Sequence, residues 1–301
     1  MNRYKIFVFI MCLLLMMNGL LLSQRELPKP SQEEIKKMEE AMPNKAIVEP
    51  DKPRKLLVFN LCQGFRHSSI PFWDKALEIM AQKTGAFTAV FSSDPNVFKA
   101  ENIKQFDAVC FNNTTGLKFS PETTPEICTS LMEFVKSGKG VVGIHAATDN
   151  FNQWPQAQEM MGGTFSGHPW TDKGTWAIKI DEPNHPLMAP FAGAGFKIKD
   201  EIYRTEPPLY SRDKQLVLMS LDMNDEVTKK TSQKPTDADT GISWVKKWGE
   251  GRVFYCSLGH NHDVAWNPPI LEHYLRGIQF ALGDLKVDVK PKSLIQPEKK
   301  N

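Results

Sequence analysis

The sequence predicts a three-layer α/β fold, in which helices cover both faces of a mostly parallel sheet. Short, continuous apolar runs recur along the first half of the chain, as is typical of strands that are buried on both faces. Segments with helix-capping residues alternate with these runs, and such alternation favours right-handed crossovers between parallel strands. In the second half, strands follow one another with few helices between them. That part therefore predicts an antiparallel or mixed extension of the sheet.

The first half of the predicted α/β fold contains four predicted strands and two predicted helices. The run 55–62 (KLLVFNLC) is apolar and ends just before a glycine, which indicates a buried strand. A helix is predicted over 68–84, with a serine cap and Pro71 in its first turn. A second helix over 124–135 is closed by a Ser-Gly pair. The remaining strands of this half are predicted at 87–91, 107–111 and 140–145.

The second half is mainly predicted strand. The segment WGEGR at 248–252 has the composition of a hairpin turn between two strands. A last helix is predicted over 269–282, and no internal repeat is found. The predicted strands are 176–180, 196–204, 216–221, 242–248 and 252–257.

The ends of the chain differ from the central domain, which we place at 54–286. Residues 1–23 begin with two basic residues and continue as an apolar run, which predicts a signal peptide or an uncleaved N-terminal anchor. We therefore expect an exported protein, periplasmic or extracellular, or one anchored to the membrane by this segment. Residues 24–53 are charged and contain five prolines, which predicts a linker or wrapping arm. Residues 287–301 form a lysine-rich tail.

The charge balance argues against a nucleic-acid partner. The chain has 37 Lys and Arg against 35 Asp and Glu, and removal of the leader would leave equal numbers. Binding to nucleic acid depends mostly on basic residues that neutralise phosphates, and no basic cluster is present. The cysteines after the leader show no CxxC spacing, so they are interpreted as buried free thiols. The sequence leaves the oligomeric state open.

Four of the seven histidines fall at predicted strand ends or in glycine-rich loops. In an open parallel sheet, ligands bind beyond the carboxyl ends of the strands. We therefore expect these four to gather near one site, whereas His185 and His273 are interpreted as structural or solvent-facing. The four are His67, His145, His168 and His260.

These histidines belong to five ordered motifs that resemble the ThuA-like proteins of trehalose utilisation, which are related to the class I glutamine amidotransferases. The resemblance covers about 55–285 and implies a flavodoxin-like fold in which a strand-turn-helix elbow presents a residue at the site. In the amidotransferases that residue is a cysteine, and here it is His145. Thiol acyl chemistry is therefore excluded. The motifs are GFRH, GIHAATD, GGTFSGHPW, KDEIYR and GEGRVFYCSLGH.

The resemblance implies carbohydrate metabolism, with an oxidised disaccharide such as 3-keto-trehalose as the substrate. An enediol route for keto-sugar isomerisation needs a base, an acid and a group that stabilises the oxyanion. We expect His145 or His67 as the base and Glu201 as its partner or as a second acid or base. Residues expected to bind the small-molecule carbohydrate are Arg66, Asp149, His168, Tyr203, His260 and Trp170.

A metal site is a second interpretation of the same residues. Two or three imidazoles with Glu201 could hold zinc or another divalent ion with an open coordination position, although the spacings match no local motif. The candidate ligands are His67, His145, His168 and His260. Two further alternatives stay open: a carbohydrate-binding protein without catalysis, and a redox or hydrolytic enzyme for another small molecule.

Overall fold

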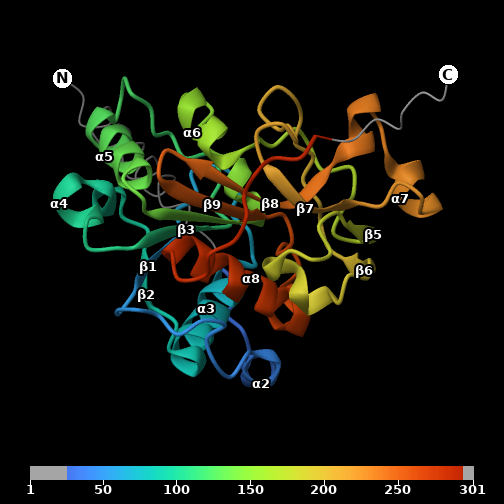
Figure 1. The fold of residues 1–301 in the computed structure, drawn as a ribbon, viewed down its shortest axis with the longest axis horizontal. Coiled ribbons are helices and arrows are strands. Elements are labelled where there is room, and N and C mark those ends of the chain that lie inside the picture. Colours follow the sequence, from blue (N-terminus) through green and yellow to red (C-terminus); the bar gives the residue numbers. More distant parts are fainter. Residues whose placement is uncertain (1–25, 294–301) are drawn as a thin grey trace, which may run out of the picture.

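The computed structural model describes residues 26–293 (Figure 1). The predicted leader at 1–23 and the end of the predicted tail lie outside the described residues. Within 26–293, no helix is long and apolar enough to cross a membrane.

One nine-stranded sheet runs through the described part of the chain, in the order β2-β1-β3-β4-β9-β8-β7-β5-β6. The strands from β2 to β9 in this order pair in parallel, and the other four continue the sheet with antiparallel pairing. The predicted mostly parallel sheet with an antiparallel extension is confirmed. The bounds are β1 Lys55–Phe59, β2 Thr88–Ser92, β3 Ala108–Asn112, β4 Gly140–Ile144, β5 Thr175–Ile180, β6 Phe196–Lys199, β7 Leu216–Leu221, β8 Gly241–Trp248 and β9 Gly251–Cys256.

The parallel half has the strand order of a flavodoxin-like fold, with β9 in the position of the fifth strand. All of the antiparallel strands lie between β4 and β9 in the sequence. They therefore form an insertion that extends the sheet at its β9 edge. In this order, β2 lies on one side of β1 and β3 lies on the other, so the strand order reverses between β1 and β3. Ligands of such folds bind at that point.

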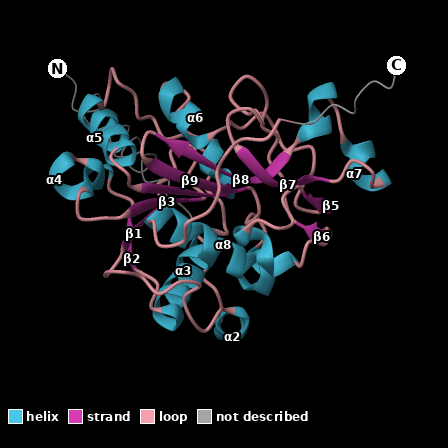
Figure 2. Cartoon of the chain, in the orientation of Figure 1, coloured by secondary structure: helices cyan, strands magenta, loops and turns pink. Residues whose placement is uncertain are grey.

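Helices cover both faces of the sheet (Figure 2). Alternate residues of β1 point to opposite faces: Leu56 and Val58 belong to the core under α3 and α8, whereas Leu57 and Phe59 belong to the core under α5 and α6. Full burial of such a side chain contributes about 1.5–3 kcal/mol, so the two cores hold the three layers together. The helices are α2 Gln32–Ala41, α3 Ile70–Thr84, α4 Ala100–Ile103, α5 Pro125–Lys136, α6 Pro155–Met161, α7 Glu226–Thr231 and α8 Pro268–Leu282.

One strand expectation fails in the inserted half. The strand predicted at 196–204 ends at Lys199, and beyond it only Ile202 and Thr205 form isolated bridges. The Arg204 guanidinium instead turns to Asp237, with Nη2 2.9 Å from Oδ2, and both side chains are buried. This ion pair and the loop before it explain why the segment leaves the sheet. The short helices α4, α6 and α7 were also absent from the sequence prediction, because four to seven residues give too little periodicity to detect.

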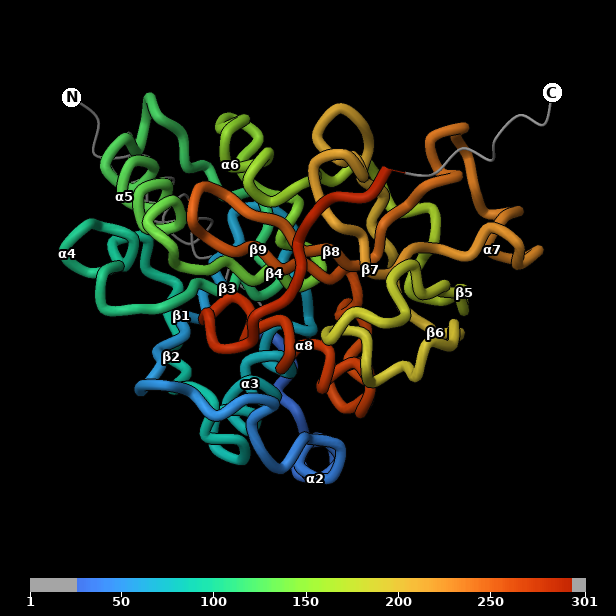
Figure 3. Tube along the Cα trace, viewed as in Figure 1, coloured from blue at the N-terminus to red at the C-terminus, as the bar shows by residue number. Residues whose placement is uncertain are grey.

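The predicted linker packs against the domain. Its helix α2 lies beside α3 (Figure 3), and Met38 and Met42 are buried in the same core as α3. Farther along this arm, the Gln279 side chain on α8 accepts from Ile47 N at 2.7 Å and donates to Val48 O at 2.6 Å. The start of the predicted tail packs as well, since Val287 and Val289 contact the core. Both segments therefore wrap around the domain.

Candidate functional site

Four elements bring polar side chains to the carboxyl edge of the parallel strands. His67 lies in the loop after β1, His145 directly follows β4, and His260 lies in the loop after β9. These strands are close neighbours in the sheet, with only β3 between β1 and β4. Glu201 reaches the same place from the loop after β6, in the inserted half.

A sharp turn after β4 aims His145 into the site. Its φ of +45° lies in the left-handed region, which residues with a side chain rarely adopt. The Nδ1 atom lies 2.7 Å from the carbonyl oxygen of Ser257, and the Tyr255 hydroxyl donates to the His145 carbonyl at 2.7 Å. Because a carbonyl only accepts, Nδ1 carries the proton. Nε2 is left with a lone pair and has no hydrogen-bond partner within residues 26–293.

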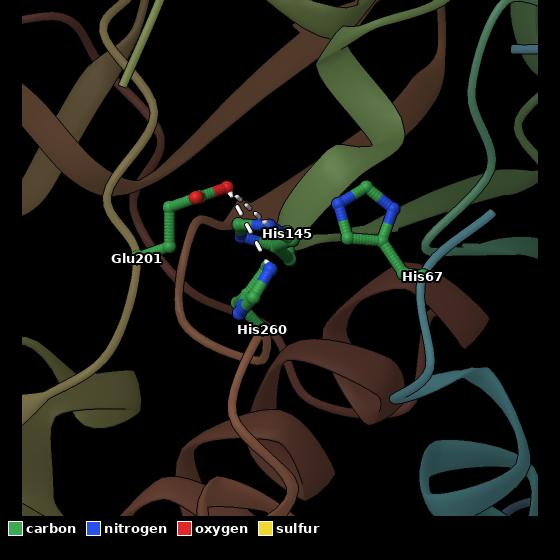
Figure 4. A group of neighbouring side chains, drawn as sticks. All are labelled: His67, His145, Glu201 and His260. Atoms are coloured by element: carbon green, nitrogen blue, oxygen red, sulfur yellow. Dashed lines mark ion pairs between the residues drawn. The ribbon is translucent and has the colours of Figure 1, made fainter. Parts of the chain in front are cut away.

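Three imidazoles and one carboxylate converge beside this turn (Figure 4). One possible ligand atom from each of His67, His145, Glu201 and His260 can be chosen so that all four lie within 4.8 Å of one another. The Glu201 Oε1 atom is 3.7 Å from His145 Nε2 and 3.9 Å from His260 Nε2. All except His260 are buried, so water competes poorly for these positions.

The imidazole rings form a nearly equilateral triangle. The ring centroids are 5.1 Å apart for His67 and His145, 5.3 Å for His67 and His260, and 5.2 Å for His145 and His260. A histidine bound to zinc through a bond of about 2.0–2.1 Å has its ring centroid about 3.2 Å from the ion, so tetrahedral angles separate the centroids by about 5.2 Å. The rings therefore have the spacing of a three-histidine metal site.

The buried carboxyl group of Asp200 holds the loop that carries His260. Asp200 accepts from the backbone N–H of Gly259 and from that of Asn261, each at 2.7 Å, on the two sides of His260. The Gly259 carbonyl in turn accepts from the Trp73 indole at 2.9 Å. Asp200 is therefore a positioning residue, and its neighbour Glu201 enters the site itself.

A comparison with protein-family models identifies the family to which this chain belongs. A family model described as trehalose utilisation, ThuA, matches residues 55–281, which is more than half of the 301 residues. The chain belongs to the ThuA family. This membership confirms the resemblance found in the motifs and indicates a carbohydrate-related role. No match was found among curated proteins.

Solved structures of ThuA-like proteins share the fold. One from Bacteroides uniformis has a TM-score of 0.56 at 19% identity, with 75% of this chain and 92% of that chain covered. Another, from Parabacteroides merdae, has a TM-score of 0.55 at 17% identity, with 83% of this chain and 94% of that chain covered. At these identities, the likeness supports the fold alone.

The buried imidazoles of this ThuA-family chain are neutral. Burial, together with the neighbouring imidazoles, lowers the pKa of His67 to about 2. Burial also lowers the pKa of His145 below its ordinary value. Burial acts to raise the pKa of Glu201, but its interactions with His145, His260 and His168 outweigh this effect and leave the pKa below its ordinary value. Neutral nitrogens beside an ionised carboxylate are the protonation states that metal ligands need.

His168 lies outside the group of four potential ligands. Its Nδ1 is 3.2 Å from Glu201 Oε2, on the side of the carboxylate away from His145, and its side chain is 48% exposed. Its ring also stacks on Phe165. The structure thus places His168 at the rim, in contact with Glu201, and gives no support to its prediction as a metal ligand.

Another predicted residue, Tyr203, lies beside the cluster. The Tyr203 hydroxyl is 3.4 Å from His67 Nε2, and its ring lies 4.4 Å from that of His145 between centroids. Burial and the Glu201 carboxylate raise the pKa of Tyr203, so it remains a hydroxyl donor. Burial raises the pKa of Asp149 to about 6, and its backbone carbonyl accepts from Gly116 N at 2.6 Å. Arg66, next to His67, is exposed.

The structure argues against sugar binding by Trp170. Its side chain is fully buried, and the indole N–H donates to the Thr228 carbonyl at 3.0 Å. No face of the ring is open to a ligand, so the prediction of a sugar contact is wrong. His185 and His273 are buried and bond backbone carbonyls, which supports the structural interpretation over the solvent-facing one.

Two residues near the site, His262 and Asp200, were not predicted from the sequence. The His262 ring stacks on Phe72, with centroids 3.8 Å apart, and its Nε2 lies 2.8 Å from Ser68 Oγ. The GHNH sequence at 259–262 was the available signal, since both histidines of this short loop follow a strand. Asp200 stands beside Glu201 in a predicted strand, and nothing local distinguishes a carboxylate that binds a distant loop. Cys110, Cys128 and Cys256 are buried and free, whereas Cys62 is half-buried.

Proposed function

We propose that this protein is an exported, metal-assisted enzyme that acts on an oxidised sugar or disaccharide by proton transfer. The observation that carries the proposal is the triangle of His67, His145 and His260 with Glu201 beside it. Membership of a trehalose-utilisation family supports a carbohydrate as the substrate class. Export rests on the apolar leader at 1–23.

The metal would be held by the three imidazoles. His145 is fixed for this role because its Nδ1–H donates to Ser257, as ligating histidines commonly donate their second nitrogen to a carbonyl. The residues fit zinc or a similar divalent ion, for which imidazole is a preferred ligand. Such an ion supplies Lewis-acid polarisation of a substrate carbonyl.

Glu201 is the group we assign to proton transfer. Its carboxylate lies close to both His145 and His260 on one oxygen, and the other oxygen is 3.2 Å from His168. An ionised carboxylate in this place can take a carbon-bound proton next to the carbonyl and return it to the neighbouring carbon. Half-exposed His168 can exchange protons between Glu201 and water. The Tyr203 hydroxyl can donate to the oxyanion and recover a proton from the neighbouring hydroxyl group as that oxygen becomes the new carbonyl.

Turnover of a keto-sugar tests this proposal. Purified protein would be incubated with 3-keto-trehalose or a 3-keto-glucoside, with and without added zinc or manganese, and followed by NMR. We expect a change of the sugar in the native protein and at least a 100-fold loss of rate in Glu201→Gln. Absence of any turnover with every metal supplied would refute the proposed enzymatic activity. Sugar binding without turnover would identify a carbohydrate-binding protein.

A further inference from the structure

A polar cavity lies beside the loop that carries His67 and is separate from the four potential metal ligands. It has a volume of about 520 Å³, within the range of about 300–1,000 Å³ that small-molecule sites occupy. Asn60, Arg66 and Asp74 line it from the domain, and Glu26 and Lys29 line it from the N-terminal arm. None of these residues belongs to the histidine cluster.

Asp74 is held rigidly at this cavity by two amides. Its Oδ2 accepts from Asn60 Nδ2 and its Oδ1 from Asn112 Nδ2, each at 2.8 Å. Asn112 is fixed in turn by donation to the Ile70 carbonyl at 3.2 Å, and it accepts from Asn113 Nδ2 at 3.0 Å. A carboxylate has about four acceptor positions, so about two remain for a ligand in the cavity that Asp74 lines.

The cavity lies where folds of this strand order bind ligands. Asn60 directly follows β1, and Asn112 is the last residue of β3. The strand order reverses between these two parallel strands, and the crevice outside their carboxyl ends is the usual ligand position in doubly wound sheets. The Asp74 network therefore belongs to the part of the fold suited to binding.

The balance of charge favours an uncharged ligand. Glu26 and Asp74 supply two negative groups to the cavity lining, and Lys29 and Arg66 supply two positive groups. Burial raises the pKa of Asp74 to about 6, so the carboxylate is ionised at neutral pH and accepts from hydroxyl groups. A neutral compound rich in hydroxyl groups can use both kinds of lining residue, as donor and as acceptor.

We propose that this cavity is a carbohydrate subsite, in which Asp74 accepts hydrogen bonds from two hydroxyl groups of one sugar ring. Arg66, which lines the subsite, precedes His67 of the cluster. The ring bound here is the unoxidised ring of a two-ring substrate, an identification that rests on the proposed function. The N-terminal arm forms one wall of the subsite through Glu26 and Lys29.

Binding of trehalose to the purified full-length protein tests the subsite independently of turnover. Isothermal titration with trehalose is expected to show binding in the native protein and at least 10-fold weaker binding in Asp74→Asn. A matched control is Glu78→Gln, a carboxylate on the same helix α3 whose side chain is 41% exposed, and it should bind as the native protein does. Thermal melting would check that Asp74→Asn folds.

A second variant keeps the test decisive if Asp74→Asn does not fold. Ser93 is an exposed residue that lines the cavity, so Ser93→Trp fills the space from outside and should also weaken trehalose binding at least 10-fold. His145→Ala should retain trehalose binding while it loses turnover, which separates this subsite from the proposed reaction. Absence of trehalose binding in the native protein, or unchanged binding in the folded Asp74 and Ser93 variants, would overturn the subsite.

Discussion

The Nδ1 atom of His145 donates its proton to the carbonyl oxygen of Ser257 across 2.7 Å. This contact joins the turn after β4 to the end of β9, two strands that are paired in the sheet. It fixes both the tautomer and the ring orientation, so that the lone pair of Nε2 points to the cluster rather than to the core. The proposed metal site therefore depends on this hydrogen bond.

Replacement of His145 should abolish tight metal binding. We expect His145→Ala to weaken zinc affinity by more than about 100-fold, because a ligand is lost from a site that has few. His168→Ala is the control, since His168 lies outside the group of four ligands. Competition with a chromogenic chelator measures both affinities. Equal losses in the two variants would show that the cluster is not the metal site.

Asp200→Asn should disturb the site without a change of ligand. The amide can accept on one side only, so one of the N–H groups of Gly259 and Asn261 loses its acceptor and the His260 loop moves. We expect zinc affinity to fall by about 10-fold, as is typical of residues that orient ligands. A purely structural role would lower the melting temperature and leave the zinc affinity of the folded protein unchanged.

Gly140→Ala should destabilise the fold where β4 meets α8. A Cβ atom at Gly140 would lie 2.1 Å from the carbonyl oxygen of Ala281, a backbone atom that cannot rotate away. We expect a loss of about 3 kcal/mol in the free energy of unfolding, measured by urea denaturation. Gly85→Ala is the comparison, because its Cβ would meet nothing within 4 Å and only its φ of +64° costs energy, about 1 kcal/mol. An equal effect of the two substitutions would contradict this packing.

Stability should rise with pH because of Lys246. This side chain is buried, its ammonium donates to the Glu159 carbonyl at 2.7 Å, and burial lowers its pKa to about 8. Below pH 8 the Lys246 side chain is charged in both the folded and the unfolded state, and burial of this charge destabilises the folded state. Between about pH 8 and 10.5 the unfolded chain binds the proton more strongly, so stability increases by up to about 3 kcal/mol.

Lys246→Met isolates this effect. The substitution keeps the apolar stem of the side chain and removes the titration, so the variant should be more stable than the native protein at pH 7 and should lose this part of the rise above pH 8. Urea denaturation at a series of pH values measures both. An identical pH dependence in the two proteins would exclude Lys246 as its source.

The sequence predicts the parallel half of the fold well, because each strand there carries a continuous apolar run. The run at 55–62 becomes β1, and the segment ending at His145 becomes β4 followed by the elbow. The structure of the inserted half is harder to predict from the sequence. Asp200 and Arg204 leave the sheet to bond Gly259 and Asp237, and such distant partners leave no periodic signal in the sequence.

The residues of the candidate site also differ in how far the sequence predicts them. His67, His145 and His260 could be found because strand ends of a parallel sheet meet at one edge, and their motifs resemble those of a known family. The burial of Trp170 could not be predicted, since a rim position such as that of His168 and a buried position look alike beside glycine and proline. Tautomer and distance, which distinguish a ligand from a neighbour, exist only in the folded chain.

The most direct test of the central claim is the metal content of the purified full-length protein, measured by inductively coupled plasma mass spectrometry after incubation with zinc and removal of free ions. We predict about one ion per chain in the native protein and almost none in the variant that combines His67→Ala, His145→Ala and His260→Ala. A native protein that retains no zinc or other divalent ion, or a triple variant that retains as much as the native protein, would contradict the account.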